Sequence, residues 1–198
     1  RFYVDVAKTF FTPRLSFERN RIAHSYSEYN KNGYVWDMFC GIGPFLIQIA
    51  KTYPKGHYIG TDINPYAIDL AKKNVKLANL EKFDIKFENI DVADFLNKSK
   101  NTRNMKTNVT RIIMNLPEKN VEFIKYLPPF ISEDGTLLHI YQFNDNNNPR
   151  EDALTHLREA LKNSQLDIKK ILNFRIVKPY NPALDTTVLD VIIVTENN

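Results

Sequence analysis

Two glycines directly after an apolar stretch have the spacing of a ligand-binding turn. The run D-M-F-C-G-I-G-P, from Asp37 to Pro44, places an acid and the pair Gly41 and Gly43 between an expected buried strand and an expected helix. Glycine lets a backbone turn pass close to a ligand, and the first N–H groups of the helix are available to bind it. A tight strand-to-helix turn without any ligand is the alternative interpretation of the same residues.

Acids at the ends of the next two expected strands extend this pattern. Asp62 comes 21 residues after Gly41, an offset at which a carboxylate accepts hydrogen bonds from ribose hydroxyls. Leu46 stands where a dinucleotide-binding turn has its third glycine, so a nucleoside without a pyrophosphate fits better. Asp91 follows the third strand, where it also suits the role of a helix cap before Ala93. The set of acids and glycines resembles the S-adenosylmethionine site of Rossmann-like methyltransferases.

The elements that must position these residues alternate between strands and helices. We expect strands at Tyr34–Phe39, Gly56–Thr61, Phe83–Phe87, Thr110–Asn115, Gly135–Gln142, Lys169–Val177 and Val188–Thr195. We expect helices at Phe17–Tyr29 with Ser16 as N-cap, Pro44–Tyr53, Pro65–Asn79, Ala93–Leu96, Lys119–Leu127 and Asp152–Lys162. This order predicts an α/β fold with a mostly parallel twisted sheet, helices on both faces and an antiparallel hairpin at one edge.

Composition narrows the possible classes of protein. A chain of 198 residues with a net charge of +4 is expected to form one main domain, and the charge permits nucleic-acid binding without requiring it. One cysteine excludes a disulfide framework, and the four scattered histidines predict no metal site. No apolar run is long enough to cross a membrane, and the start at Arg1 without a visible signal peptide suggests a fragment.

The remaining polar stretches differ in what they predict: one basic group permits phosphate contact, and two segments rich in Asn carry no functional signal. The basic residues near the end of the chain suit phosphate contact, although solvated surface charge is an equally good interpretation; they are Lys169, Lys170, Arg175 and Lys178. Asn97–Asn108 is rich in Asn and Lys and predicts a flexible insertion, and Asn144–Asn148 predicts a short polar loop.

The segment Asn115-Leu116-Pro117 follows the fourth expected strand. A fixed amide and a stiff turn can hold the edge of a planar base close to a methyl donor. The segment resembles the N-P-P-Y-type motif of methyltransferases that act on planar nitrogen. Taken alone, the segment is better explained as an ordinary turn at the end of a strand; after the preceding acids and glycines, the motif is the better explanation.

Four segments together resemble the archaeal and eukaryotic tRNA (guanine-N1)-methyltransferases that modify position 37. They are F-T-P-R-L-S-F-E-R at 11–19, D-M-F-C-G-I-G-P-F at 37–45, D-I-N-P at 62–65 and M-N-L-P at 114–117. The resemblance runs from about Phe2 to the final strand. It implies a lead-in at 1–30 that carries the P-R-L-x-x-E-R motif and a Rossmann-like methyltransferase domain at 31–198. The small N-terminal tRNA-binding domain of the family would precede Arg1.

The resemblance also implies a role for individual residues. Glu18 matches the base of the family, and Asn115 and Pro117 would meet the cofactor and the target base. The expected cofactor-binding residues are Arg19, Asp37, Phe39, Gly41, Gly43, Asp62, Ile63, Asp91, Val92 and Asn115. Phe10 replaces a Tyr that the family often has four residues before the Arg of P-R-L, so any role of that hydroxyl is absent.

The chemistry of guanine agrees with these roles. N1 carries a proton and becomes a good nucleophile only when that proton leaves, which a carboxylate such as Glu18 can accept. Negative charge then spreads onto O6, where Arg14 is the first candidate donor and Asn115 the second.

The sequence therefore predicts an enzyme that transfers methyl from S-adenosylmethionine to N1 of guanosine 37 in tRNA. Two alternatives stay open: the aminocarboxypropyl transferase of the wybutosine pathway, and a catalytically inactive RNA-binding module. We expect tRNA as the partner, a monomer, no membrane association and an intracellular location, in the cytoplasm, nucleus or mitochondrial matrix.

Overall fold

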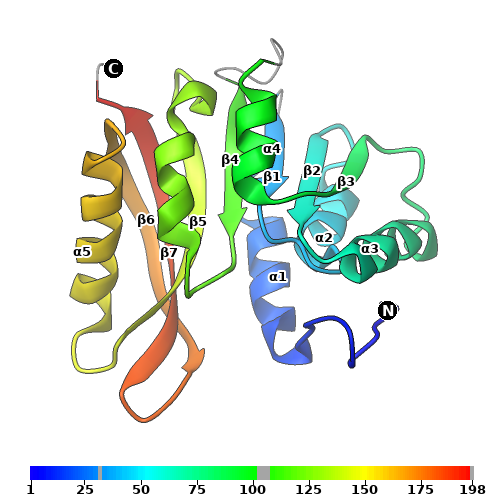
Figure 1. Ribbon diagram of the computed structural model, residues 1–198, viewed down its shortest axis with the longest axis horizontal. Helices are drawn as coiled ribbons and strands as arrows, with labels where there is room; N and C mark the ends of the chain where they lie inside the picture. Colours follow the sequence, from blue (N-terminus) through cyan, green and yellow to red (C-terminus); the bar gives the residue numbers. More distant parts are fainter. Residues whose placement is uncertain (31–32, 102–107, 197–198) are drawn as a thin grey trace. The chain divides into compact units, whose positions relative to one another are not determined.

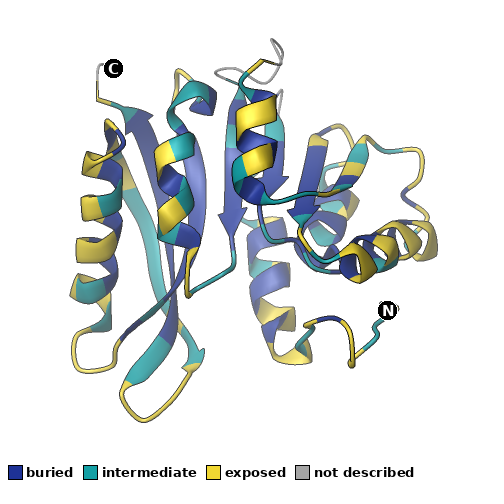
Figure 2. Ribbon diagram, viewed as in Figure 1, coloured by how far each residue is buried: buried dark blue, intermediate teal, exposed yellow. Residues whose placement is uncertain are grey.

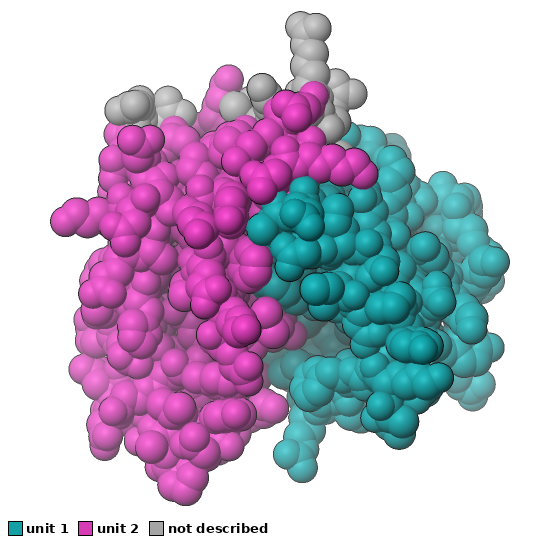
Figure 3. All heavy atoms as spheres, viewed as in Figure 1, with its two compact units in different colours: residues 1–95 teal, residues 96–198 magenta. Residues whose placement is uncertain are grey.

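The computed structural model describes residues 1–30, 33–101 and 108–196. The chain forms two compact units, Arg1–Phe95 and Leu96–Asn198, which Figure 3 shows in teal and magenta. This division is a different one from the lead-in and methyltransferase domain that the sequence predicts, and those domain boundaries stay a prediction.

Unit 1 contains three parallel strands in the order β3-β2-β1: β1 (Tyr34–Asp37), β2 (His57–Asp62) and β3 (Ile85–Asn89). Parallel neighbours need a crossover connection, which α2 (Pro44–Thr52) and α3 (Pro65–Leu77) provide. The lead-in forms a 3-10 turn η1 (Pro13–Leu15), the helix α1 (Ser16–His24) and a second 3-10 turn η2 (Ser27–Asn30). Helix α4 (Val92–Ser99) begins in unit 1 and ends in unit 2.

A buried amide ties the lead-in of unit 1 to its glycine-rich turn. Asn74 of α3 is 1% exposed, and its Nδ2 donates to the carbonyl oxygens of Ile42 and Tyr3. Its Oδ1 accepts from the N–H of Tyr3 at 2.6 Å. One side chain thus satisfies three backbone groups that the loops leave unpaired, and it fixes both segments against α3.

Unit 2 contains four strands in the order β4-β5-β7-β6: β4 (Val109–Met114), β5 (Thr136–Asp145), β6 (Leu166–Pro179) and β7 (Leu184–Thr195). β4 and β5 are parallel, whereas β7 is antiparallel to both of its neighbours, as the predicted edge hairpin requires. Helix α5 (Pro149–Lys162) packs on these strands, and Figure 2 shows its outer surface as exposed against the dark blue of the buried strands. Two 3-10 helices complete the unit, η4 (Asn120–Tyr126) and η5 (Pro128–Phe130); η4 replaces the α-helix predicted at Lys119–Leu127.

Helix α1 differs from its prediction at both ends. Ser16, expected as the N-cap, is the first helical residue, and Leu15 takes the cap position without a side-chain hydrogen bond because η1 continues directly into α1. The helix ends at His24, earlier than predicted. Tyr26 has a φ of +58°, a left-handed conformation that a right-handed helix cannot contain.

Two polar stretches contribute more regular structure than predicted. Asn144 extends β5 and is fully buried, because Thr187 of β7 donates a hydrogen bond to its side-chain oxygen. Ser99, inside the predicted insertion Asn97–Asn108, is the buried last residue of α4. Residues 102–107 of that insertion lie outside the described residues.

A buried polar network connects three strands of unit 2. The Nε of Arg111 on β4 donates to Nε2 of His139 on β5 at 2.9 Å, and Nδ1 of His139 lies 2.6 Å from Oδ1 of Asp190 on β7. All three side chains are fully buried. Because Nε2 accepts, the imidazole is neutral and its proton is on Nδ1, where it donates to Asp190. The network holds β4, the strand that leads to Asn115, in a fixed register with its neighbours.

Candidate functional site

The glycine-rich turn after β1 gives its two glycines different tasks. Gly43 has a φ of +81°, and a Cβ there would lie 2.6 Å from Cζ of Phe87, so this glycine is needed for packing. Gly41 has a φ of +53°, but the nearest atom to a Cβ would be the carbonyl oxygen of Phe10 at 3.8 Å. Gly41 is therefore the glycine that leaves room beside the turn for a ligand.

Asp62 at the end of β2 is held in place by the same turn. Its Oδ2 accepts from the N–H of Gly41 at 2.8 Å, and its Oδ1 accepts from the N–H of Asn64 at 2.9 Å. A carboxylate oxygen has more than one acceptor position, so this fixed and partly exposed group retains capacity for hydroxyl donors. The next residue, Ile63, is 71% exposed and offers an apolar surface beside the carboxylate.

Asp37 at the end of β1 is the most unusual group of the turn. The side chain is 1% exposed, and neither carboxylate oxygen has a hydrogen-bond partner of good geometry. Burial raises the pKa of Asp37 to about 8, opposed by the nearby N–H of Phe39 and reinforced by the negative charge of Asp62. A buried carboxylate without a partner favours either a proton or a bound cation.

Asp91 and Val92 lie where the chain leaves β3 and enters α4. Oδ1 of Asp91 accepts from the N–H of Ala93 at 2.7 Å. Asp91 therefore caps the helix, which was the alternative to ligand binding in the sequence analysis. The Val92 side chain is 4% exposed and packs inward. The structure thus gives both residues a structural task, and their contact with a cofactor stays a prediction.

Glu18 on α1 is buried rather than exposed at the start of the helix. Its side chain is 3% exposed, and Oε2 accepts from Nη2 and Nε of Arg21 at 2.9 and 3.1 Å. A buried carboxylate needs a charge partner, and Arg21, one helical turn away, provides it. Arg14, the first candidate donor for O6, is exposed on η1.

Arg19 organises the lead-in. Its Nη2 donates to the carbonyl oxygen of Thr12 at 2.6 Å, and its guanidinium lies 4.5 Å from the ring centre of Phe11. These contacts fix the P-R-L segment against α1, while the expected contact of Arg19 with a cofactor stays a prediction.

The structure describes residues 1–30, 33–101 and 108–196, and two further features are absent from these ranges. Within these residues no three His, Cys, Asp or Glu side chains are grouped as metal ligands. No helix in the same ranges has the length and apolar character to span a membrane.

A family model described as the TRM5/TYW2 methyltransferase domain matches residues 1–169, which is most of the chain. The chain belongs to this family. Among curated proteins, tRNA (guanine(37)-N(1))-methyltransferase Trm5b of Pyrococcus abyssi is 32% identical over 191 residues, covering 96% of this chain and 52% of that protein. Trm5b of Methanocaldococcus jannaschii is 35% identical over 192 residues, covering 96% of this chain and 48% of that protein. The chain thus spans about half the length of these relatives.

Solved structures of the TRM5/TYW2 family share the fold. The crystal structure of Trm5b from Pyrococcus abyssi matches with a TM-score of 0.79 and 29% identity over 98% of this chain and 53% of that chain. The complex of aTrm5 and tRNALeu matches with a TM-score of 0.71 and 36% identity over 97% of this chain and 50% of that chain. TYW2 of M. jannaschii in complex with AdoMet gives a TM-score of 0.81 at 24% identity, over 98% of this chain and 82% of that chain. These matches confirm the predicted Rossmann-like methyltransferase fold.

The predicted site residues of this TRM5/TYW2 domain are divided between the two units. Unit 1 brings Asp37, Gly41 and Asp62 together at the carboxyl ends of β1 and β2. Asn115 and Pro117 follow β4 in unit 2, where both are partly buried. Their role at the cofactor and the target base stays a prediction.

Sequence reasoning missed two residues that shape the site. Arg21 is the charge partner of Glu18, and the spacing of three residues on an expected helix was a usable signal for it. Asn74, which holds the turn at Ile42, lies in the middle of α3 and gives no local signal, because its partners are distant in sequence.

The Glu18–Arg21 pair predicts a measurable coupling in stability. The single variants Glu18→Gln and Arg21→Gln and the double variant form a cycle, read from the free energy of unfolding in urea. We expect a coupling energy of about 1–3 kcal/mol, because both partners are largely buried. The exposed pair Asp5–Lys8, at 4.0 Å and with the same spacing, is the matched control and should couple by less than about 1 kcal/mol. Additive effects in the Glu18 cycle would contradict the assigned pairing.

Proposed function

We propose that this chain is the catalytic part of a tRNA (guanine(37)-N1)-methyltransferase that uses S-adenosylmethionine. The observation that carries the proposal is the buried Asp37 carboxylate, unpartnered beside the glycine-rich turn, in a chain of the TRM5/TYW2 family. S-adenosylmethionine carries two cationic groups, an ammonium and a sulfonium, and either would satisfy this carboxylate. The curated relatives named above and the aTrm5–tRNALeu complex support tRNA as the substrate.

The residues of unit 1 fit the different parts of this cofactor. Asp62 accepts from ribose hydroxyls, since two backbone N–H groups already orient its carboxylate. Ile63 offers its exposed apolar side chain to the adenine ring. Gly41 leaves room along the turn for the methionine part of the cofactor. Asp37 faces the positive charge of that part. When bound, the cofactor supplies an electrophilic methyl group on its sulfonium.

The chemistry on guanine is assigned to residues of the chain. Glu18 accepts the N1 proton, so the N1–H electron pair stays on nitrogen and becomes the nucleophile for the methyl group. Arg21 keeps the Glu18 carboxylate oriented through two hydrogen bonds to Oε2. Arg14 and Asn115 are the donors that stabilise the charge on O6, and Pro117 packs against the base.

A direct assay distinguishes this function from its alternatives. With a tRNA transcript that carries guanosine at position 37, we expect label from methyl-labelled S-adenosylmethionine to enter the RNA at N1 of that nucleotide. Label from carboxyl-labelled S-adenosylmethionine should stay out of the RNA. Incorporation of the carboxyl label would instead indicate the aminocarboxypropyl transferase, and RNA binding without either label would indicate an inactive module. A transcript with adenosine at position 37 is the matched control.

The proposed base has its own test. Glu18→Gln keeps size and hydrogen bonding but cannot accept the N1 proton, so single-turnover methyl transfer should fall by roughly 100-fold or more. Affinity for S-adenosylmethionine should stay within about threefold, because Glu18 acts on the chemical step rather than on binding. Glu28→Gln, on the exposed η2 turn, is the control and should keep the parental rate. A Glu18→Gln protein with a near-parental rate would show that another group takes the proton.

A further inference from the structure

The β6–β7 hairpin of unit 2 forms a long arm, defined here as residues 175–188 (orange to red in Figure 1). Ten residue pairs join β7 to β5, and they end at Asp145↔Leu184. Beyond this point the hairpin closes through the N–H groups of Tyr180 and Asn181, which both donate to the carbonyl oxygen of Leu184. Figure 2 shows the tip of the arm as exposed, and at its base Thr186, Thr187 and Val188 of β7 are buried.

A β-bulge gathers basic side chains on one face of the arm. Arg175 pairs with Val188 and Lys178 pairs with Thr186, and the register shifts between Ile176 and Lys178. Paired residues share a face and successive residues alternate, so without the shift Arg175 and Lys178 would point to opposite faces. The extra residue in the bulge puts both cations on the same face.

An aromatic contact holds the tip of the arm. The ring of Tyr180 stacks on that of Phe143 of β5, with 3.9 Å between centroids and 22° between planes. Phe143 pairs with Thr186, so it lies on the same face as Lys178. Tyr180 is nevertheless 51% exposed. The tip is therefore held against β5 with Tyr180 exposed, and Arg175 and Lys178 are half-buried.

The register relates this basic face to the segment predicted to contact the target base. Met114 pairs with Ile140, Ile140 with Leu189 and Leu189 with Phe174, so Arg175 is level with Asn115. Three strand spacings of about 4.8 Å separate β4 from β6, which gives roughly 14 Å. One RNA molecule that presents its base at Asn115 therefore passes within reach of the arm.

Two acidic residues near the tip lie on different faces of the arm. Asp145 pairs with Leu184, two residues before Thr186 on β7, so it lies on the same face as Lys178; its Oδ1 accepts from the N–H and Nδ2 of Asn147. Asp185 pairs with Asn144, and by alternation it lies on the face opposite Thr186 and Lys178. Arg175 and Lys178 thus share their face with one exposed acid near the tip, Asp145, while Asp190 on the same face is fully buried against His139.

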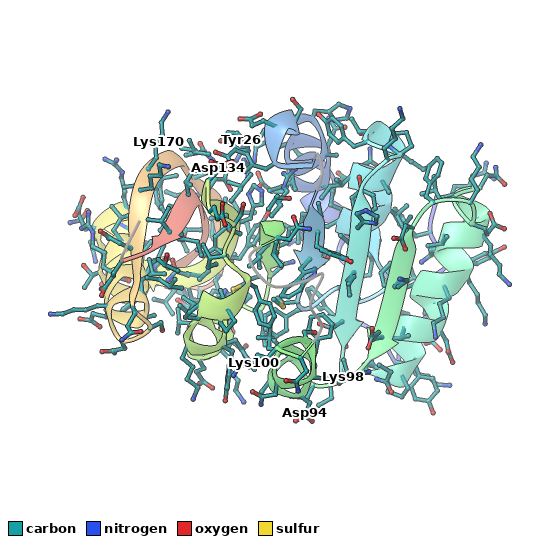
Figure 4. The ribbon with its side chains drawn as sticks, turned by 90° about the horizontal axis from the view of Figure 1, so that it is seen from above. Tyr26, Asp94, Lys98, Lys100, Asp134 and Lys170 are labelled. Atoms are coloured by element: carbon teal, nitrogen blue, oxygen red, sulfur yellow. The ribbon has the colours of Figure 1, made fainter. Side chains whose placement is uncertain are left out.

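The other basic residues of β6 lie at the far end of the strand. Lys170 pairs with Ile192, which pairs with Leu137 at the start of β5, the end remote from Asn115. The neighbouring Lys169 donates to the carbonyl oxygen of Asp134 at 3.4 Å, and Figure 4 shows Lys170 and Asp134 close together at this end. The structure therefore divides one basic group of the sequence into two pairs with different surroundings.

We propose that the arm binds the RNA substrate through its backbone, with Arg175 and Lys178 contacting phosphates next to the target base. This inference rests on the proposed function for the identity of the RNA. It assigns no such contact to Lys169 and Lys170, which gives the test a matched control within the same strand.

The experiment compares Arg175→Gln/Lys178→Gln with Lys169→Gln/Lys170→Gln in the 198-residue chain, using the unmodified tRNA transcript as probe. At low salt we expect the arm pair to weaken RNA binding by roughly tenfold and the control pair by less than about twofold. The slope of log K against log salt should flatten by roughly 1.4 for the arm pair, at about 0.7 for each lost contact with single-stranded phosphate. The KM for tRNA should rise while kcat stays parental.

Two results would overturn the inference about the arm, and a third would separate it from the proposed function. Parental binding by the arm pair, or equal losses in both pairs, would overturn the inference, because the contact would be absent or spread over all surface charge. A selective loss of RNA binding by the arm pair in a chain that transfers no methyl group would support the arm while contradicting the proposed function.

Discussion

The burial of the Asp37 carboxylate without a hydrogen-bond partner is the constraint on which the candidate site depends. A folded chain normally pairs such a group or leaves it in water, because removing charge from water without compensation is costly. Here burial raises the pKa of Asp37 to about 8, reinforced by the negative charge of Asp62 and opposed by the N–H of Phe39. The arrangement is unfavourable for the free protein and favourable for a complex with a cation.

A second buried carboxylate, that of Glu18, has different surroundings. Glu18 has its own cation, Arg21, within 3 Å. Its charge is therefore paired before any substrate arrives, and the pair holds the carboxylate in a fixed place. Asp37 is incomplete, as suits a group whose proposed task is to bind. The two carboxyl groups thus differ in their neighbours, and the two proposed tasks, binding and proton transfer, follow from that difference.

Local patterns predicted the strands, the glycine-rich turn and the acids after β1, β2 and β3 well, because each depends on residues close in sequence. The N-cap at Ser16 was wrong because η1 runs into α1 without a break. Asn144 was wrongly placed in a loop, since the Thr187 partner that allows its burial is 43 residues away. Packing gives Gly41 and Gly43 their different tasks, and strand register separates Lys178 from Lys170. Neither packing nor register can be read from sequence spacing.

Counting the protons released when S-adenosylmethionine binds is the most direct test of the proposed role of Asp37. Below pH 8 the buried carboxylate of Asp37 holds a proton in the free protein, and a bound cation favours its ionised form, so binding expels the proton. Titration calorimetry at about pH 6.5, where an α-amino group is already protonated, in buffers of different ionisation enthalpy measures this number. We predict that close to one proton is released by the parental chain and none by Asp37→Asn, which should also bind more weakly. Binding without proton release, or equal release by both proteins, would contradict the assignment of Asp37 as the group that meets the cofactor's charge.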